Sequence, residues 1–199
     1  MEMVTRTTAI SQTDERCITL ELPHDRPLRL GVLSDTHYFS RPVPIPAEVI
    51  DRLSTCEAFV HCGDFIDPTL LDPLRARGPV FAVLGNVDPA QLAPEFPHQI
   101  LLLIGSWRVG IVHAAGNSER TWRRTAARFS KPLDVLLCGH SHRPVARHLG
   151  DFTVLNPGSA VDPRGLPSPS IAAVELSTLL SIHLMALPYG SGSTANRAW

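Results

Sequence analysis

The chain has 199 residues, a formal net charge of −1 and an apolar content of 44%, which predicts one globular domain with a sizeable core. The near-neutral charge gives no basis for electrostatic capture of nucleic acid or of an anionic membrane surface. No apolar run approaches the roughly 18 residues that a membrane span needs, and residues 1–16 lack the apolar stretch of a signal peptide. We therefore expect a cytoplasmic protein.

The first half of the chain alternates apolar strands with segments of helical spacing. Residues 1–27 are expected to form an N-terminal extension with at most a short strand over 17–22. Strands are predicted at 28–33, 58–62 and 80–84, helices at 46–53 and 67–77, and a proline-rich loop without regular structure at 38–46. Such alternation is typical of βαβ units with parallel strands. In these sheets the functional residues gather at the carboxyl ends of the strands.

In the second half of the chain, most apolar runs are separated by short turns, a pattern that favours antiparallel strand pairs. Gly105 and Ser106 separate two apolar runs and predict a hairpin. The further expected elements are a helix over 117–129, a strand over 133–138, a strand pair at 145–148 and 152–155, and a closing antiparallel pair at 171–176 and 180–187. We predict one domain over residues 28–188, followed by a flexible tail at 189–199.

The four cysteines argue against two kinds of site. They are Cys17, Cys56, Cys62 and Cys138, and none forms a CxxC pair. A zinc site built from thiolates is therefore not expected, and a reducing compartment gives no reason to expect a disulfide framework.

Polar side chains with metal-binding chemistry follow five of the predicted strands. They are Asp35, His37, Asp64, Asn86, His113, His140 and His142. Oxygen and imidazole ligands together suit divalent ions such as manganese, iron, zinc, cobalt or nickel. Seven ligands exceed what one ion takes from a protein that also holds a substrate, so we expect two ions that share a carboxylate. Two ions roughly 3.5–4 Å apart can clamp a phosphate and lower the pKa of a bridging water, giving hydroxide for in-line attack at phosphorus.

Each motif is weak alone, but their order is specific. The motifs DxH at 35–37, GD at 63–64, GNxD at 85–88, His113 and GHxH at 139–142 each follow a predicted strand. This set resembles the calcineurin-like metallophosphoesterase superfamily. The short chain, the Asn-Pro-Gly-Ser segment at 156–159 and the Asp-Pro-Arg segment at 162–164 resemble its small bacterial and archaeal phosphodiesterase branch.

The resemblance covers about residues 28–188 and implies an α/β fold, a four-layer α/β/β/α sandwich of the metallo-dependent phosphatase type. It implies that Asp64 bridges two divalent ions. One ion would also take Asp35, His37 and His142, and the other Asn86, His113 and His140. Manganese is the first expectation, with nickel, zinc, iron, cobalt or magnesium as alternatives.

One position departs from the family pattern. Many members have histidine in the third motif, GNHD, to protonate the leaving group or to steady the phosphate, but this chain has Val87 there. A valine after a strand can simply be packing. The functional interpretation is loss of the general acid, which is worth roughly 10²–10⁴-fold in rate, so we expect activated phosphodiesters to be better substrates than phosphomonoesters. Asp88, which would orient that histidine, is expected only to cap the local turn.

Other polar residues have more ordinary interpretations. His61 is expected inside the sheet or behind the ligands, and His24, His98, His148 and His183 at the surface or in packing. The arginines of residues 120–128 predict a solvated helix face, the alternative being a rim that attracts an anionic substrate. Asn86 and Arg143 are candidate phosphate contacts, and residues 156–159 are expected to form a structural turn near the site.

Three functions compete. The first is a dinuclear-metal phosphodiesterase acting on a small phosphodiester, and homo-oligomerisation is left open. The second is a non-catalytic, metal-binding scaffold, because the resemblance extends to the small retromer subunit; the complete ligand set favours catalysis. The third, a nuclease or protein phosphatase, is disfavoured because the chain has no accessory domain or long insertion to grip a polymer.

Overall fold

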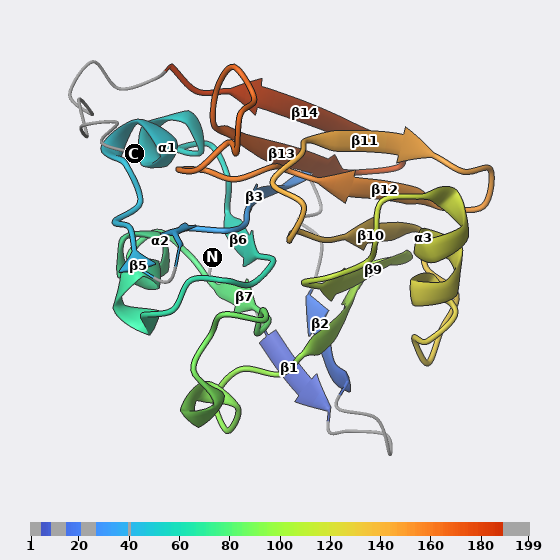
Figure 1. Cartoon of the computed structure of the whole chain (residues 1–199). Helices are drawn as coiled ribbons and strands as arrows, with labels where there is room; N and C mark the ends of the chain where they lie inside the picture. Colours follow the sequence, from blue (N-terminus) through green and yellow to red (C-terminus); the bar gives the residue numbers. More distant parts are fainter. Residues whose placement is uncertain (1–4, 9–14, 21–26, 40, 189–199) are drawn as a thin grey trace.

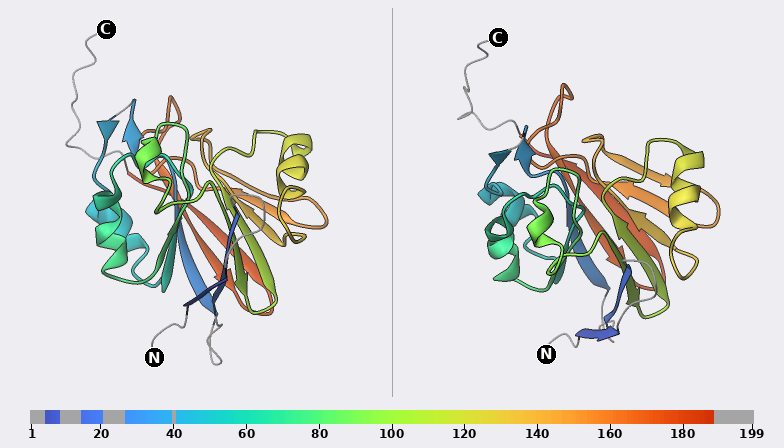
Figure 2. Two further views of the ribbon diagram at one scale, coloured as in Figure 1. Left: turned by 90° about the horizontal axis from the view of Figure 1, so that it is seen from below. Right: turned by 60° about the horizontal axis from the view of Figure 1, so that its bottom comes forward.

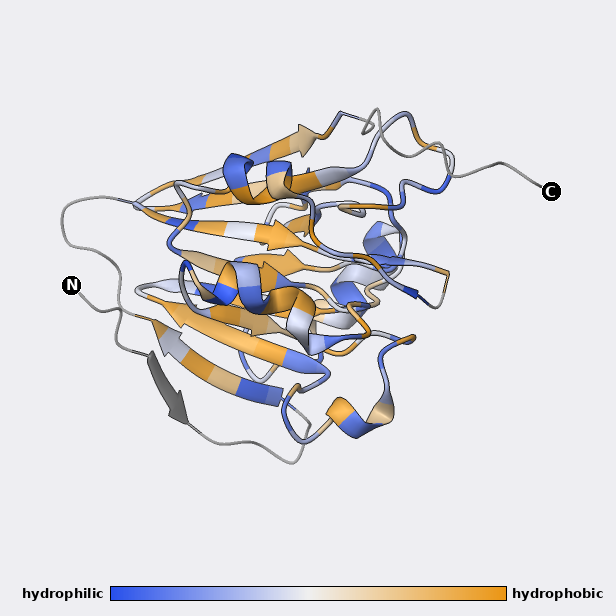
Figure 3. Cartoon of the chain, turned by 90° about the vertical axis from the view of Figure 1, so that its left-hand side faces the viewer, coloured by the Kyte–Doolittle hydropathy of each residue, from blue (hydrophilic) through white to orange (hydrophobic). Residues whose placement is uncertain are grey.

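Two β-sheets packed against each other form the centre of the computed structural model (Figure 1). The structure describes residues 5–8, 15–20, 27–39 and 41–188. A large cluster of buried side chains fills the space between the sheets and takes residues from both, for example Val32 and Val60 from one and Ile111 and Val135 from the other. In Figure 3 the strands are coloured mainly as hydrophobic, as expected for strands that are covered on both faces.

The smaller sheet carries the predicted parallel strands. Its order is β14 (Leu180–Ala186), β13 (Ser170–Leu176), β3 (Leu28–Leu33), β6 (Ala58–His61) and β7 (Val80–Ala82). β3, β6 and β7 are parallel, which confirms the βαβ prediction, and β13 joins β3 in the antiparallel sense. The carboxyl ends of these three strands therefore meet at one edge.

The larger sheet has a mixed order. From one edge to the other it contains β1 (Thr5–Thr8), β2 (Glu15–Leu20), β8 (Gln99–Ile104), β9 (Trp107–Val112), β10 (Val135–Leu137), β12 (Thr153–Asn156) and β11 (Val145–His148). β8 and β9 form the predicted hairpin, with Gly105 at φ 57° in its turn. β9 and β10 are parallel, so their carboxyl ends also lie together.

Helices cover the outer face of each sheet, which gives the predicted four layers (Figure 2). α1 (Ala47–Arg52) and α2 (Asp72–Arg75) pack on the smaller sheet through Val49, Leu53 and Leu74. α3 (Glu119–Ala126) packs on the larger sheet through Trp122, and Ser118 caps its first turn. The four-layer α/β/β/α fold is confirmed.

Three local predictions are wrong. The 67–77 segment is a 3₁₀ turn, η1 (Pro68–Leu71), followed by the short α2, because Pro73 has no N–H to continue the helix from the turn before it. The helix expected over 117–129 is limited to α3. In the proline-rich loop, β4 (His37–Tyr38) pairs with β5 (Arg41–Pro42), since proline is tolerated at an edge. A further 3₁₀ turn, η2 (Ala90–Leu92), follows β7.

The predicted N-terminal extension is only partly described. β2 is longer toward its start than the expected strand and pairs in parallel with β8, so residues 15–20 belong to the larger sheet. The tail predicted at 189–199 and His24 lie outside the described residues. None of the helices in the described ranges has the length and apolarity that a bilayer crossing requires.

Candidate metal centre

Five loops at the carboxyl ends of β3, β6, β7, β9 and β10 carry the seven candidate ligands. The backbone in these loops is unusual, because Asp35, Asp64, His140 and His142 have positive φ values of 56°, 62°, 69° and 56°. Such conformations in residues other than glycine cost free energy and persist where the surroundings enforce them, often at functional sites. The strain therefore coincides with the predicted ligands.

The first cluster consists of Asp35, His37 and His142, whose side chains are at most 1% exposed. The Nε2 atom of His142 lies 3.3 Å from Oδ1 of Asp35, and Nε2 of His37 lies 4.0 Å from the same oxygen. None of these three atoms has a hydrogen-bond partner within the described residues. A buried polar atom without a partner is costly, and three that converge on one point fit a divalent cation.

The second cluster consists of Asp64, His113 and His140. Nε2 of His113 lies 3.1 Å from Oδ2 of Asp64. The Oδ1 atom of Asn86 is 3.1 Å from that nitrogen and 2.7 Å from Nδ1 of His140, so Asn86 lies at the same point. All seven predicted residues are thus brought together.

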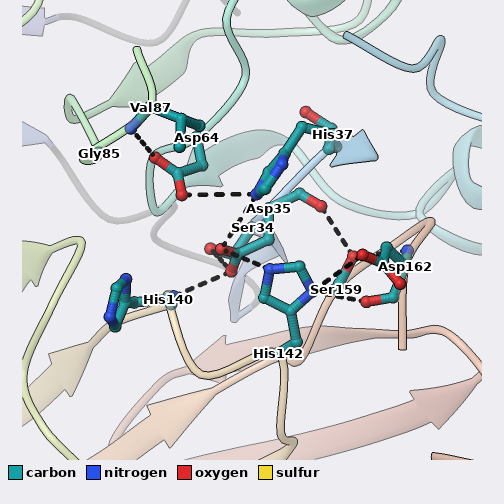
Figure 4. Close-up of polar contacts among 12 residues, drawn as sticks. Ser34, Asp35, His37, Asp64, Gly85, Val87, His140, His142, Ser159 and Asp162 are labelled. Atoms are coloured by element: carbon teal, nitrogen blue, oxygen red, sulfur yellow. Dashed lines mark hydrogen bonds and ion pairs between the residues drawn. The ribbon is translucent and has the colours of Figure 1, made fainter. Parts of the chain in front are cut away.

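Asp64 lies between the two clusters. Its Oδ2 atom is 3.5 Å from Nε2 of His37 in the first cluster and 3.1 Å from Nε2 of His113 in the second. Figure 4 shows the Asp64 carboxylate facing His37, with Asp35 and His142 beyond. One carboxylate in this place is suited to join two ions.

Backbone carbonyls fix the orientation of three of the histidines. Nδ1 of His113 lies 2.7 Å from the carbonyl of Cys62, and Nδ1 of His37 lies 2.5 Å from that of Phe39. Nδ1 of His142 lies 2.5 Å from the carbonyl oxygen of Asp162. A carbonyl only accepts, so each Nδ1 donates its proton, and in the neutral ring Nε2 keeps a lone pair for a metal.

The charges of the centre call for a cation. Burial alone would raise the pKa of Asp64, but the close imidazoles of His113 and His37 hold that pKa far below its usual value. The close contact with the carboxylate of Asp64 raises the pKa of His37. For His113, burial lowers the pKa, but contact with Asp64 and the charge of Asp35 outweigh burial and raise it. Two buried carboxylates thus attract positive charge, which a divalent ion supplies.

Two glycines permit this close approach. A Cβ atom at Gly85 would lie 2.0 Å from Oδ1 of Asp64, and one at Gly139 would lie 1.8 Å from Oγ of Ser34. Ser34 in turn donates to Oδ2 of Asp35 at 2.6 Å. A larger residue at either glycine would displace a candidate ligand.

Asp88 has a wider role than the predicted cap of a local turn. Its carboxylate accepts hydrogen bonds from the backbone amides of Asp64 at 2.9 Å, Ile66 at 2.5 Å and Gly85 at 2.7 Å. It therefore ties the loop after β6 to the loop after β7. The amide of Val87 also donates to Oδ1 of Asp64 at 3.0 Å, a role that is independent of the side chain and has no signal in the sequence.

The segment after Asn156 supports the first cluster more directly than a simple turn. Ser159 is fully buried, and its Oγ donates to the carbonyl of Asp35 at 2.7 Å and accepts from the amide of Asp162 at 2.8 Å. Asp162 holds His142, as described above. The pKa of His140 is lowered mainly by burial and next by the charge of His113. The charge of Arg164, two residues beyond Asp162, adds to this lowering. Neither Ser159 nor Arg164 could be selected individually from the sequence.

The remaining polar predictions have mixed outcomes. His61 is fully buried behind the candidate ligands, where its Nε2 atom lies 3.1 Å from Oγ1 of Thr36. The side chains of His98, His148 and His183 are exposed. Both expectations are confirmed. Arg143 is exposed, and the only described contact involving it is from its backbone amide to Ser141. Its role at a phosphate stays a prediction.

The chain is similar to known proteins in sequence and in fold. The sequence model of the protein family described as the calcineurin-like phosphoesterase superfamily domain matches residues 28–179. A probable metallophosphoesterase of Methanocaldococcus jannaschii is 34% identical over 160 residues, which covers 79% of this chain and 81% of that protein.

Solved structures share the fold at lower identity. An archaeal phosphodiesterase superposes with a TM-score of 0.64 at 22% identity, covering 80% of this chain and 100% of the other. Vps29 of Chaetomium thermophilum gives 0.65 at 20% identity, with 80% and 97% covered. These two similarities concern the fold alone.

Proposed function

Because the chain belongs to the calcineurin-like phosphoesterase superfamily, we propose that it is a metal-dependent phosphodiesterase with two divalent ions. The observation that carries the proposal is the convergence of three buried, unpartnered atoms in the first cluster, Asp35 Oδ1, His37 Nε2 and His142 Nε2. Asp64 beside them makes a second ion position with His113, His140 and Asn86. Two divalent ions supply charge withdrawal from a phosphate and a water of lowered pKa.

The ligands differ in exposure, which indicates where substrate enters. Asp35, His37, His142, Asp64 and His113 are at most 5% exposed, whereas Asn86 and His140 are exposed. The Oδ1 atom of Asn86 faces His113 and His140, so its Nδ2 is available to donate to a phosphate oxygen. A phosphodiester would then approach from the Asn86 side, and Asn86 would orient it.

Val87 sets the expected substrate preference. Its side chain has no proton for the departing oxygen, so the leaving group must depart as an anion or take a proton from water. Esters of acidic alcohols, such as phenols, tolerate this better than alkyl esters. The proposal is therefore a phosphodiesterase that favours activated leaving groups.

A non-catalytic scaffold remains the second candidate, and one observation favours it. Tyr38 and Phe39, directly after the ligand His37, are 56% and 77% exposed and contact each other with ring centroids 4.8 Å apart. An exposed aromatic pair is a typical protein contact. All seven ligand positions are nevertheless filled, which supports catalysis.

Metal identity, location and assembly are proposed on general grounds. Manganese is the first candidate, because a centre of carboxylate, amide and imidazole ligands suits it. A reducing cytoplasm suits four free cysteines, three of them buried. The substrate is proposed to be a small phosphodiester rather than a nucleic acid, and a homo-oligomer stays open.

Metal titration of stripped protein tests the proposal at the level of the site. Calorimetry should find two ions per chain, and Asp64→Asn should weaken both because Asp64 contacts both clusters. Asp51→Asn, at an exposed aspartate of α1, is the matched control and should bind like wild type. Binding of only one ion, or equal effects of the two variants, would contradict the dinuclear proposal.

A further inference from the structure

A cavity adjoins the second cluster. Its volume is about 480 Å³, and Asn86 and His113 form part of its wall. Thr125 of α3 and Arg128, just after α3, line it as well. Leu84 and Val112 add buried apolar surface. A group attached to a phosphate at the metal centre can therefore extend into this cavity.

The charge of the cavity favours an anion. Arg128 lines it, whereas no aspartate or glutamate is among the described residues that do. Within the described part of the chain, the guanidinium of Arg128 has no ion pair or hydrogen bond, in contrast to that of Arg123, which is held by Glu119 and Asp151. An arginine at a cavity wall, free of carboxylates, is suited to pair with phosphate or carboxylate.

We propose that this cavity binds the part of the substrate beyond the scissile phosphate, and that Arg128 pairs there with a second anionic group. This proposal rests on the proposed phosphodiesterase function and narrows its substrate to phosphodiesters that carry a further phosphate or carboxylate. Thr125, on the same wall, offers a hydroxyl to the same group. Arg128 is thus a specificity residue and does not take part in bond cleavage.

Three p-nitrophenyl phosphodiesters with one leaving group test the proposal. Their second arm is ethyl, 2-carboxyethyl or 2-phosphonoethyl, so they differ only in the group that would enter the cavity. Wild type should prefer the anionic arms in kcat/KM by about tenfold, the lower end of what a hydrogen bond to a charged group contributes. Arg128→Ala should remove this preference by lowering kcat/KM for the anionic arms relative to the ethyl ester, and Arg128→Lys should keep part of it.

Arg124→Ala is the matched control, because Arg124 is an exposed arginine of α3 that does not line the cavity. It should retain the preference. Whichever arm, carboxylate or phosphonate, gives the larger gain in kcat/KM over the ethyl ester identifies the anionic group that Arg128 prefers. Equal kcat/KM for all three esters in wild type, or equal losses in Arg124→Ala and Arg128→Ala, would overturn the proposal.

A binding measurement separates this proposal from the proposed function. Calorimetry of metal-loaded protein with 2-phosphonoethyl methyl phosphate reports binding without turnover. If no ester is hydrolysed but binding depends on Arg128 and not on Arg124, the phosphodiesterase proposal fails and the anion site stands. If binding is the same in Arg128→Ala and wild type, the anion site is wrong.

Discussion

The carboxylate of Asp88 accepts a hydrogen bond from the backbone amide of Asp64 at 2.9 Å. It accepts two more from Ile66 and Gly85, so one side chain holds the loop in which Asp64 has a φ of 62°. Asp88→Asn places an NH₂ group where an acceptor is needed. We expect metal binding to weaken about 10–100-fold, as for other groups that orient ligands, measured by calorimetry against the Asp51→Asn control. Unchanged affinity would show that the Asp64 loop is held by other contacts.

Restoring a proton donor at position 87 should change substrate preference. Val87→His is expected to raise hydrolysis of unactivated diesters and monoesters, within the roughly 10²–10⁴-fold range of general acid catalysis. Activated aryl diesters should gain less, because their leaving groups need no proton. Val87→Gln, similar in length but without an acidic proton, is the control; the idea fails if the diester-to-monoester ratio of kcat/KM is unchanged by histidine.

Ser159→Ala should destabilise the fold near the first cluster. The substitution leaves the buried carbonyl of Asp35 without its 2.7 Å hydrogen bond, which costs about 1–3 kcal/mol. Denaturant unfolding of metal-free protein measures the loss. Ser141→Ala is the comparison, since that hydroxyl is only partly buried, and it should cost less.

His61 should make the metal-free protein sensitive to mild acid. Burial lowers the pKa of His61 from 6.5 to about 4. Below pH 6.5 the unfolded chain takes up this proton first, so stability falls as the pH is lowered from 6.5 to 4. The difference between the pKa of His61 in the unfolded and in the folded chain corresponds to a loss of about 3 kcal/mol in the free energy of unfolding.

His61→Gln tests this pH dependence, because glutamine can still contact Thr36 but does not titrate. Unfolding free energies of metal-free wild type and variant should diverge with pH over that window, the variant losing less. Parallel curves would assign the acid sensitivity to other groups, such as Asp35 and Asp64.

The sequence predicted the parts of the fold that depend on local pattern. Apolar runs placed β3, β6 and β7, and the polar residues after them indicated one edge of the sheet. Segments shaped by neighbours were harder: the Pro68–Arg75 segment has helical spacing, but Pro73 divides it. Alternating residues predict a strand only over 17–22, whereas the earlier start of β2 at Glu15 and its place in the larger sheet depend on its pairing with β8.

The candidate site shows the same division. The convergence of the seven candidate ligands could be predicted because their residue types and order are informative. The groups that orient them could not, since Phe39, Asp162 and Val87 act through backbone atoms. The arginines of residues 120–128 were given an anion-attracting rim only as an alternative, and which of them lines the cavity beside the second cluster, Arg128, depends on the packing of α3 on the larger sheet.

The most direct test of the account is hydrolysis by metal-stripped protein of bis-p-nitrophenyl phosphate and p-nitrophenyl phosphate, with manganese, nickel, zinc or magnesium added singly. We predict that diester cleavage requires metal, exceeds monoester cleavage and is lost in Asp64→Asn. Monoester preference would keep a phosphoesterase but contradict the role given to Val87. No turnover with any metal, although two ions bind, would contradict the central claim and favour a scaffold.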